Sequence, residues 1–329
     1  MVLDPQTEGV SESWNAFVDK SPQGSIYATT TYLDALDVDY KLLALQVGDT
    51  IQAGMVLSKG MFKSHSNPLF VKYLGLMFEP MASPKQAVNT SREIKLSEPF
   101  INYLKTIPGV QYTFSPEYTY WAPFYWAGYK QQTAYTYVMP LSRKDSWFKE
   151  ATNEVRICHR KALENGFKLV RLNPENEDEM AGQYALNMAA YLKRNQKPPI
   201  SRERFDKFVR AMHKADAIRL YTVRNSEGMD LVSGVIVFDK RKSYFIINGT
   251  HDDAPHFANS FLFTELVKTI HDMGLDFDFE GSMIEPIAHF IRFFNGEITA
   301  YSRIWKPDLR LKLKTTVVKT ARSILGYNR

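Results

Sequence analysis

Hydrophobic and polar residues alternate in patterns that predict the same order of elements in both halves of the chain. Helical spacing of apolar residues predicts long helices at 86–106, ended by Pro108 and Gly109, and at 259–273, ended by Gly274. The other predicted helices are a short one after Ser11, then 30–36, 146–165, 177–195, 201–214 and 285–294. The predicted strands are 41–47, 51–57, 70–76, 110–114, 167–171, 218–224, 231–238, 243–249, 275–280 and 298–305. Each half therefore has helices, three consecutive strands, a long helix and a further strand.

This order of elements is the one used by GNAT acyltransferase domains. We therefore predict an α/β protein with two tandem GNAT-like domains, in which helices flank mixed sheets. The length of 329 residues suits two cores, and we place the domains at 1–142 and 143–305. The remaining residues, 306–329, form a basic C-terminal tail.

The excess of basic residues is concentrated in that tail. Residues 306–329 contain seven lysines or arginines and one aspartate, so they account for the net charge of +5, and the rest of the chain is close to neutral. A basic tail suits an anionic membrane surface or an RNA backbone, while a solvated terminal helix is the alternative. The N-terminus shows no signal peptide and no apolar run spans a bilayer, so we expect a cytoplasmic protein, with membrane contact through the tail.

The strand predicted at 275–280 carries the strongest chemical signal. Strand side chains alternate between faces, so Phe277 and Phe279 face one way, and Asp276, Asp278 and Glu280 face the other. Carboxylates on one face of a central strand are costly unless they are paired, hydrated or used in chemistry. Ligands of open α/β sheets gather at the carboxyl ends of strands, where Glu280 lies. A structural alternative is a carboxylate paired with an arginine.

The loop 250–259 argues against coenzyme A bound in the usual GNAT manner. That mode needs a glycine-rich loop whose backbone N–H groups hold the pyrophosphate at a helix N-terminus. This loop has no glycine and contains Asp252 and Asp253, which repel phosphate. It also contains His251 and His256, but no second cluster has the spacing of metal ligands, and the chain has one cysteine. We therefore expect no metal and no cofactor, with acyl-CoA as a co-substrate being the alternative.

Several short segments, taken in order, resemble the FemABX family. They are 24–33 (GSIYATTTYL), 123–129 (PFYWAGY), 135–138 (YTYV), 156–166 (RICHRKALENG), 279–282 (FEGS) and 290–296 (FIRFFNG). The likeness is to the Fem-like branch labelled as acetyltransferase-like or methicillin-resistance proteins. It implies tandem GNAT domains that transfer amino acids from aminoacyl-tRNA onto peptidoglycan precursors.

The chain also departs from the ligases of that family. The lysine that the resemblance places beside the tRNA terminus falls on Ile291, and a first-domain lysine that holds the diphosphate of the precursor falls near Leu36. A basic residue, Lys193 or Arg194, is present where the family has an arginine. The ligase interpretation is therefore weaker than the fold interpretation.

Together these patterns predict a Fem-like acyl or aminoacyl transferase that forms an amide bond on an amine acceptor. Glu280, with Asp278, positions or deprotonates the amine, a cation offsets the negative charge that develops, and Tyr301 donates a proton. The predicted catalytic residues are Glu280, Asp278, Arg292 and Tyr301, and the predicted substrate-binding residues are Lys193, Arg194, Asn248, His251, Ser282, Arg303 and Lys306. The expected partners are aminoacyl-tRNA and a peptidoglycan precursor. The alternatives are an acyl-CoA-dependent N-acyltransferase and a non-catalytic module that binds envelope glycans or membrane.

Overall fold

A computed structural model describes residues 2–59, 64–281 and 283–306, and its contacts divide the chain into two compact units. Unit 1 holds the described residues of 1–24, 39–133 and 301–329, and unit 2 holds Ser25–Val38 and Ala134–Ala300. These units differ from two consecutive stretches at 1–142 and 143–305, because an early segment, 25–38, belongs to unit 2. Of the predicted basic tail, Lys306 alone is described.

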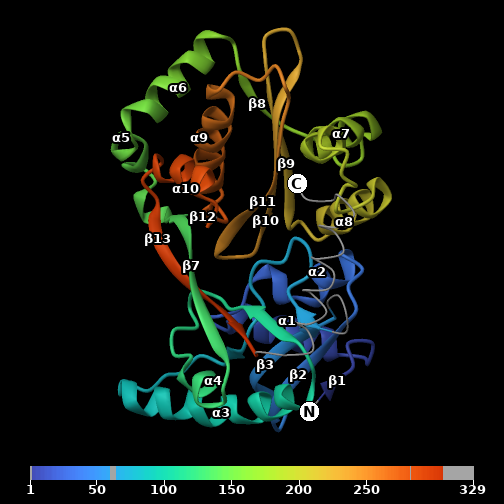
Figure 1. The fold of residues 1–329 in the computed structure, drawn as a ribbon, viewed down its shortest axis with the longest axis vertical. Coiled ribbons are helices and arrows are strands. Elements are labelled where there is room, and N and C mark those ends of the chain that lie inside the picture. The colour runs from blue at the N-terminus through green and yellow to red at the C-terminus, as the bar shows by residue number, and fades with distance from the viewer. Residues whose placement is uncertain (1, 60–63, 282, 307–329) are drawn as a thin grey trace, which may run out of the picture. The chain divides into compact units, whose positions relative to one another are not determined.

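Unit 1 is built on a hairpin and one long helix (Figure 1). The hairpin of β2 (Tyr40–Val47) and β3 (Thr50–Ser58) lies at the centre of a sheet with the order β1-β2-β3-β5, in which β1 is Val2–Leu3 and β5 is Met77–Phe78. A second group of strands joins β6 (Val110–Thr113) to β4 (His65–Ser66) in parallel and to the end of β13 (Glu297–Trp305) in antiparallel orientation. The helices are α1 (Val10–Lys20), α3 (Gln86–Thr106) and α4 (Ala122–Trp126).

The aromatic-rich region of unit 1 packs partly against itself. Phe124 lies edge-on to Phe114 and to Tyr129, with ring centroids 5.2 and 5.3 Å apart, and all three rings are buried. Tyr125 and Trp126, on the same short helix α4, are largely exposed. The region therefore contributes both a core and an aromatic surface.

Unit 2 contains a mixed sheet with the order β13-β7-β12-β11-β10-β9-β8. Its strands are β7 (Lys130–Met139, which begins in unit 1), β8 (Lys168–Arg171), β9 (Ile218–Arg224), β10 (Asp230–Phe238), β11 (Lys242–Thr250), β12 (Asp276–Asp278) and the start of β13. The antiparallel pairs are β8 with β9, β9 with β10, β10 with β11 and β12 with β7. Strands β11 and β12 run parallel. A parallel pair needs a crossover, which helix α9 (Phe257–Asp272) supplies.

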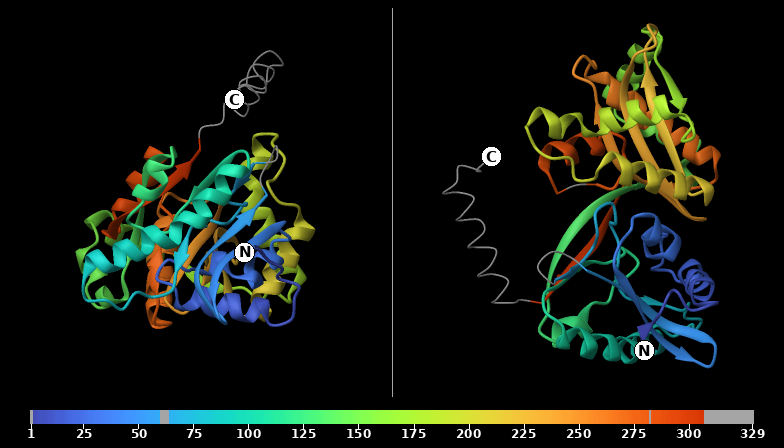
Figure 2. Two further views of the ribbon diagram at one scale, coloured as in Figure 1. Left: turned by 90° about the horizontal axis from the view of Figure 1, so that it is seen from below. Right: turned by 90° about the vertical axis from the view of Figure 1, so that its right-hand side faces the viewer.

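Helices cover both faces of this sheet (Figures 1 and 2). Helix α9 lies on one face, beside α6 (Asn153–Glu164), while α7 (Glu177–Lys193) and α8 (Arg202–Lys214) lie on the other. The remaining helices of unit 2 are η1 (Ile26–Ala28), α2 (Thr30–Ala35), η3 (Leu141–Arg143), α5 (Trp147–Glu150) and α10 (Glu285–Arg292). Of these, α2 packs against α8.

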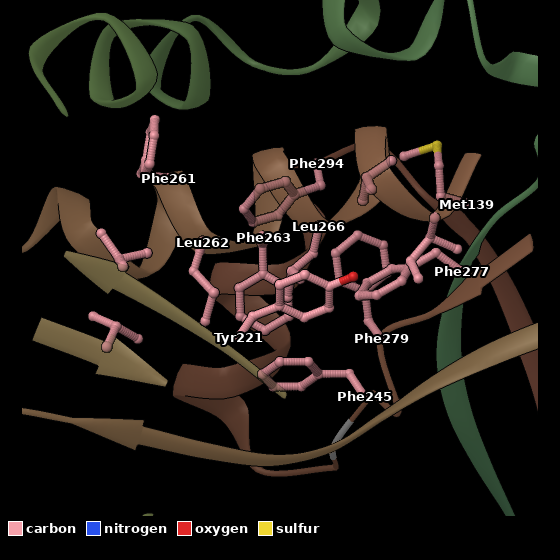
Figure 3. Packing of buried hydrophobic residues seen from close by; sticks show 14 of the residues in the cluster. Met139, Tyr221, Phe245, Phe261, Leu262, Phe263, Leu266, Phe277, Phe279 and Phe294 are labelled. Atoms are coloured by element: carbon pink, nitrogen blue, oxygen red, sulfur yellow. The ribbon is translucent and has the colours of Figure 1, made fainter. Parts of the chain in front are cut away.

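An aromatic cluster forms the core between the sheet and α9 (Figure 3). Phe263 of α9 contacts Phe245 of β11 at 4.5 Å between ring centroids, and it stacks on Phe279 at 5.6 Å. Phe277 and Phe279 are both buried, and Asp278 between them is buried as well, so burial alone does not distinguish the two predicted faces. The same rings also form the base of the cavity described below.

Most predicted elements are present, and three predictions need correction. Residues 70–76 form no strand: Phe70 has a left-handed backbone (φ 61°), and Leu74 donates a single backbone bond to Thr113. The helix predicted at 146–165 is interrupted at Ala151 and Thr152, which are extended. Strand β7 was not predicted at all.

Candidate active site

The parallel strands β11 and β12 separate at their carboxyl ends, and this opening creates the site. Their pairing stops at Tyr244 and Asp278, after which the Phe279 N–H bonds to the Tyr137 carbonyl of β7 instead of to β11. On the other edge of β11, the register with β10 shifts and leaves Ile246 without a partner residue. A β-bulge of this kind turns backbone groups out of the ladder.

A cavity of about 580 Å³ fills this opening. Residues 245–248 of β11 form one side, Asn259 and Phe263 of α9 form the base, and Pro286 to Ile291 of α10 form the opposite side. Glu280 is the one carboxylate among the described residues that line it. The volume lies in the range of small-molecule sites.

Asp278 and Thr136 fix the backbone that carries Glu280. The Thr136 hydroxyl donates to Asp278 Oδ1 at 2.5 Å, and the backbone N–H of Glu280 donates to the same oxygen at 2.8 Å. The N–H of Gly281 in turn donates to Thr136 Oγ1 at 2.8 Å. A Cβ at Gly281 would lie 2.8 Å from Thr136 Cα, so only glycine fits. Asp278 is 0% exposed and thus acts on the position of Glu280 rather than on a ligand.

The Glu280 carboxylate is held by a tyrosine from the distant N-terminal segment. The hydroxyl of Tyr27, in η1, donates to Glu280 Oε1. The Tyr27 ring is 0% exposed and packs against Tyr32 and Tyr244, with centroids 5.3 and 4.9 Å away. The segment is anchored by the Ile26 N–H, which donates to Asp239 Oδ2 at 3.1 Å.

The electrostatics keep both tyrosines protonated. Burial raises the pKa of Tyr27 well above its ordinary value, and the negative charge of Glu280 raises it further. The pKa of Tyr32 is raised for the same two reasons, burial first. Tyr27 is therefore a permanent hydrogen-bond donor to the carboxylate, which orients it and stabilises its ionised form.

The predicted substrate-binding residues of β11 and α7 lie in different places. Asn248 lines the cavity, where its Nδ2 donates to Ser233 O and Asn259 Oδ1, both at 3.2 Å. His251 lies outside it, beside α7, and its Nδ1 accepts from the Asp253 N–H at 3.1 Å. Lys193, at the end of α7, forms an ion pair with Asp252, and the next residue, Arg194, is exposed.

The structure does not bring the other predicted residues into the cavity lining. Arg292 ends α10 and is exposed, with its guanidinium 5.3 Å from the Phe293 ring. Tyr301 is buried in unit 1 against Tyr73, with ring centroids 5.5 Å apart. Arg303 and Lys306 also belong to unit 1: Arg303 pairs with Thr113 across the ladder, and Lys306 Nζ donates to the Lys105 carbonyl. Ser282 lies outside the described residues.

Comparison with known proteins bears on the fold. Residues 149–283 match the family model described as an acetyltransferase (GNAT) domain. Among solved structures, FemX is similar over 92% of this chain and 96% of its own, with a TM-score of 0.65 and 12% identity. A tandem GNAT protein from the clavulanic acid biosynthesis pathway covers 93% and 96%, with a TM-score of 0.53 and 10% identity. The chain has the tandem GNAT fold.

L-PGS from Bacillus licheniformis is also similar in structure, with a TM-score of 0.58 and 11% identity over 92% of this chain and 94% of its own. None of the curated proteins matches the sequence of this chain. The predicted fold class and the Fem-like tandem arrangement are thus confirmed. The match of residues 149–283 to the acetyltransferase (GNAT) domain model likewise supports the prediction of an acyltransferase.

Two absences hold for the described residues 2–59, 64–281 and 283–306. No helix among them has both the length and the apolar character that a membrane span requires. No group of three or more histidine, cysteine, aspartate or glutamate side chains among them is placed to hold a metal ion.

The sequence missed three residues of this site: Tyr27, Thr136 and Tyr244. Both Tyr27 and Thr136 lie in segments that carry the Fem-like resemblance, 24–33 and 135–138, so a signal was present. It gave no indication that these segments meet Glu280, because 253 residues separate Tyr27 from Glu280.

Proposed function

We propose that unit 2 transfers an acyl or aminoacyl group from an activated ester or thioester to an amine. The observation that carries this proposal is the position of Glu280. Its carboxylate lines the cavity where β11 and β12 separate, and it accepts a hydrogen bond from the Tyr27 hydroxyl, which orients it. A fixed carboxylate beside a cavity suits general-base catalysis of amide formation.

In this reaction the amine nitrogen attacks the carbonyl carbon and forms the new C–N bond. One proton of the amine passes to Glu280, and the C–O or C–S bond to the carrier breaks. The leaving oxygen or sulfur then takes up that proton, so the carboxylate is regenerated. Ile246, which the bulge leaves without a partner residue on β10, lines the cavity, and we propose its backbone N–H as a donor to the oxyanion.

Both kinds of donor remain candidates, and separate observations support each. The Fem-like fold supports aminoacyl-tRNA as the donor and a cell-wall precursor peptide as the acceptor, in the cytoplasm or at the inner face of the membrane. The ion pair of Lys193 with Asp252 supports acyl-CoA, because it offsets one of the two carboxylates in the loop 250–259. The N-terminus of α9 also follows that loop and favours an anion.

The test is a transfer assay with Glu280→Gln. Purified protein is given acyl-CoA or aminoacyl-tRNA together with muropeptide or lysine-containing peptide amines, and amide products are counted by mass spectrometry. Removal of a general base lowers turnover by about 10²–10⁴-fold, so a loss below about tenfold contradicts this role. Glu285→Gln is the matched control, because that exposed side chain at the start of α10 lies outside the cavity lining, and it should keep full activity.

A further inference from the structure

We propose that the cavity beside Glu280 binds an apolar acyl chain of several carbons, so that the activated donor carries a fatty-acyl-type group rather than an acetyl or a polar aminoacyl group. This inference rests on the proposed function, because it assigns the donor group of the same site. Four features of unit 2 support it. They are the apolar lining of the cavity, the lack of lysine and arginine among its described lining residues, the exposed aliphatic residues near the start of α10, and the cavity volume.

The lining is mainly aromatic and aliphatic. Nine of the thirteen described residues that line the cavity are apolar. Phe263 lies at the centre of its base, with its ring centroid 4.5 Å from that of Phe245 and 5.5 Å from that of Phe290. Figure 3 shows how closely Phe245, Phe263 and Phe279 approach one another in this base. Such a surface gains free energy from methylene groups and none from a charged ligand.

The polar residues of the lining leave little for a charged donor group to bind. None of the described lining residues is a lysine or arginine, so a phosphate finds no permanently charged cation there, and His256 is the one basic side chain among them. Asn248 and Asn259 bond to each other at 3.2 Å, which uses part of their capacity. Ile291 stands where the family resemblance expects a lysine, and it is 3% exposed.

Exposed apolar residues lie in and just before the start of α10, which lines the cavity. Ile287 lines the cavity and is 43% exposed, and Met283 and Ile284, which precede it in the chain, are 53% and 60% exposed. Exposed aliphatic side chains close together are typical of a binding surface for an apolar ligand. A chain too long for the cavity would lie along these residues. The volume of about 580 Å³ is also far larger than an acetyl group needs.

The test measures binding across a series of thioesters with acyl chains of two to ten carbons. Each chain is attached to N-acetylcysteamine and, in a second arm, to coenzyme A, and binding to the full-length protein is measured by calorimetry. We expect Kd to fall about fourfold for each added methylene until the cavity is full. Equal slopes in the two arms support the proposal whichever thiol carrier delivers the chain. A Kd that does not change with chain length overturns it.

Two variants show whether the chain binds in this cavity. Ile287→Glu places a carboxylate in the lining, and we expect it to weaken binding of the ten-carbon thioester at least tenfold more than binding of the two-carbon one. Ile298→Glu makes the same change at an aliphatic residue of β13 that is 67% exposed and outside the lining. In this variant the Kd should fall with acyl-chain length as steeply as in the unmodified protein. An equal effect of both variants contradicts the proposal.

The outcomes also separate this inference from the proposed function. Amide formation from acetyl or aminoacyl donors, with no dependence on chain length, leaves the transferase proposal standing and overturns the acyl-chain inference. Steep chain-length dependence of binding, with no amide formed from any donor, supports the acyl-chain cavity and contradicts the transferase.

Discussion

Glu280 has a backbone conformation that non-glycine residues rarely adopt. Its φ of 51° lies in the left-handed region, and its N–H is tied to Asp278. Conformations of this kind cost about 1–3 kcal/mol and persist where surrounding contacts enforce them, commonly at functional sites. The bonds through Asp278 and Thr136 are those contacts. Replacement of Asp278 would therefore release the turn as well as remove a charge.

Tyr27→Phe tests the hydrogen bond that orients the carboxylate. Because the bond stabilises ionised Glu280, we expect its loss to lower turnover about tenfold and to move the acidic limb of the pH–rate profile to higher pH. Steady-state rates between pH 5 and 9 would measure both effects. Tyr129→Phe is the control, since its buried hydroxyl has no hydrogen-bond partner in the part of the chain that the structure describes, and its removal should leave the pH–rate profile unchanged. A purely structural role of Tyr27 would lower stability without moving that limb.

At this scale the sequence indicated the position of the strand better than its bounds and its contacts. Alternation of Phe277 and Phe279 with carboxylates indicated a buried strand, which the structure places at Asp276–Asp278, two residues short of Glu280. No local pattern indicates that Tyr301, the predicted proton donor, and Arg303, a predicted substrate-binding residue, lie in the part of β13 that belongs to unit 1. A hydrogen bond between Tyr27 and Glu280 depends on the tertiary path of the chain, which local periodicity does not encode.

Helix α7 lies unusually close to β11 at one glycine. A Cβ on Gly249 would lie 2.5 Å from the Leu186 carbonyl oxygen and 2.6 Å from Ser233 Oγ. The first of these is backbone, so it cannot rotate away. This close contact places α7 against the strand whose other residues, 245–248, line the cavity.

Gly249→Ala should therefore destabilise the protein by about 1–3 kcal/mol, because helix and strand must move apart. Urea unfolding at constant m-value measures this change. Gly182→Ala, within α7, meets no atom within 4 Å and should instead stabilise by about 0.5–1 kcal/mol through helix propensity. Equal effects of the two substitutions would contradict a steric role for Gly249.

The element predictions succeeded where one periodicity extended over many residues. The helix expected at 86–106 has those bounds, and the strands β9, β10 and β11 lie within one residue of their predicted limits. They failed where aromatic residues are dense, as in β7, because alternation is hidden when both faces of a strand carry rings or hydroxyls. They also failed at 70–76, where an apolar run is buried without a full strand ladder.

The chain passes between its two units more than once. Residues 25–38 leave unit 1 for unit 2, while β7 and β13 each begin in one unit and end in the other. The sequence predicted two domains from the repeated order of elements, and no local pattern indicates such an exchange of segments. The physical reason is that strand pairing is set by complementary edges rather than by distance along the chain.

The fragment 143–305 should therefore fail to fold alone. It lacks residues 134–139 of β7, which pair with β12 at Val138 and Met139, and it lacks Tyr27 beside Glu280. We expect the isolated fragment to be insoluble or to lose its near-ultraviolet circular dichroism, and co-expression with 1–142 to restore a soluble, ordered protein. A well-folded isolated fragment would show that the borrowed segments are dispensable.

This interleaving also affects how the protein is made. Unit 2 requires both residues 25–38 and the start of β13, so it cannot be completed until translation has passed about residue 300. At about 5–20 residues per second, the early segment waits roughly 15–50 s for its partners. In the first part of that time, until α8 has been translated at residue 214, the apolar side chains of α2 have no native neighbour in α8, which makes the nascent chain a natural client for ribosome-associated chaperones.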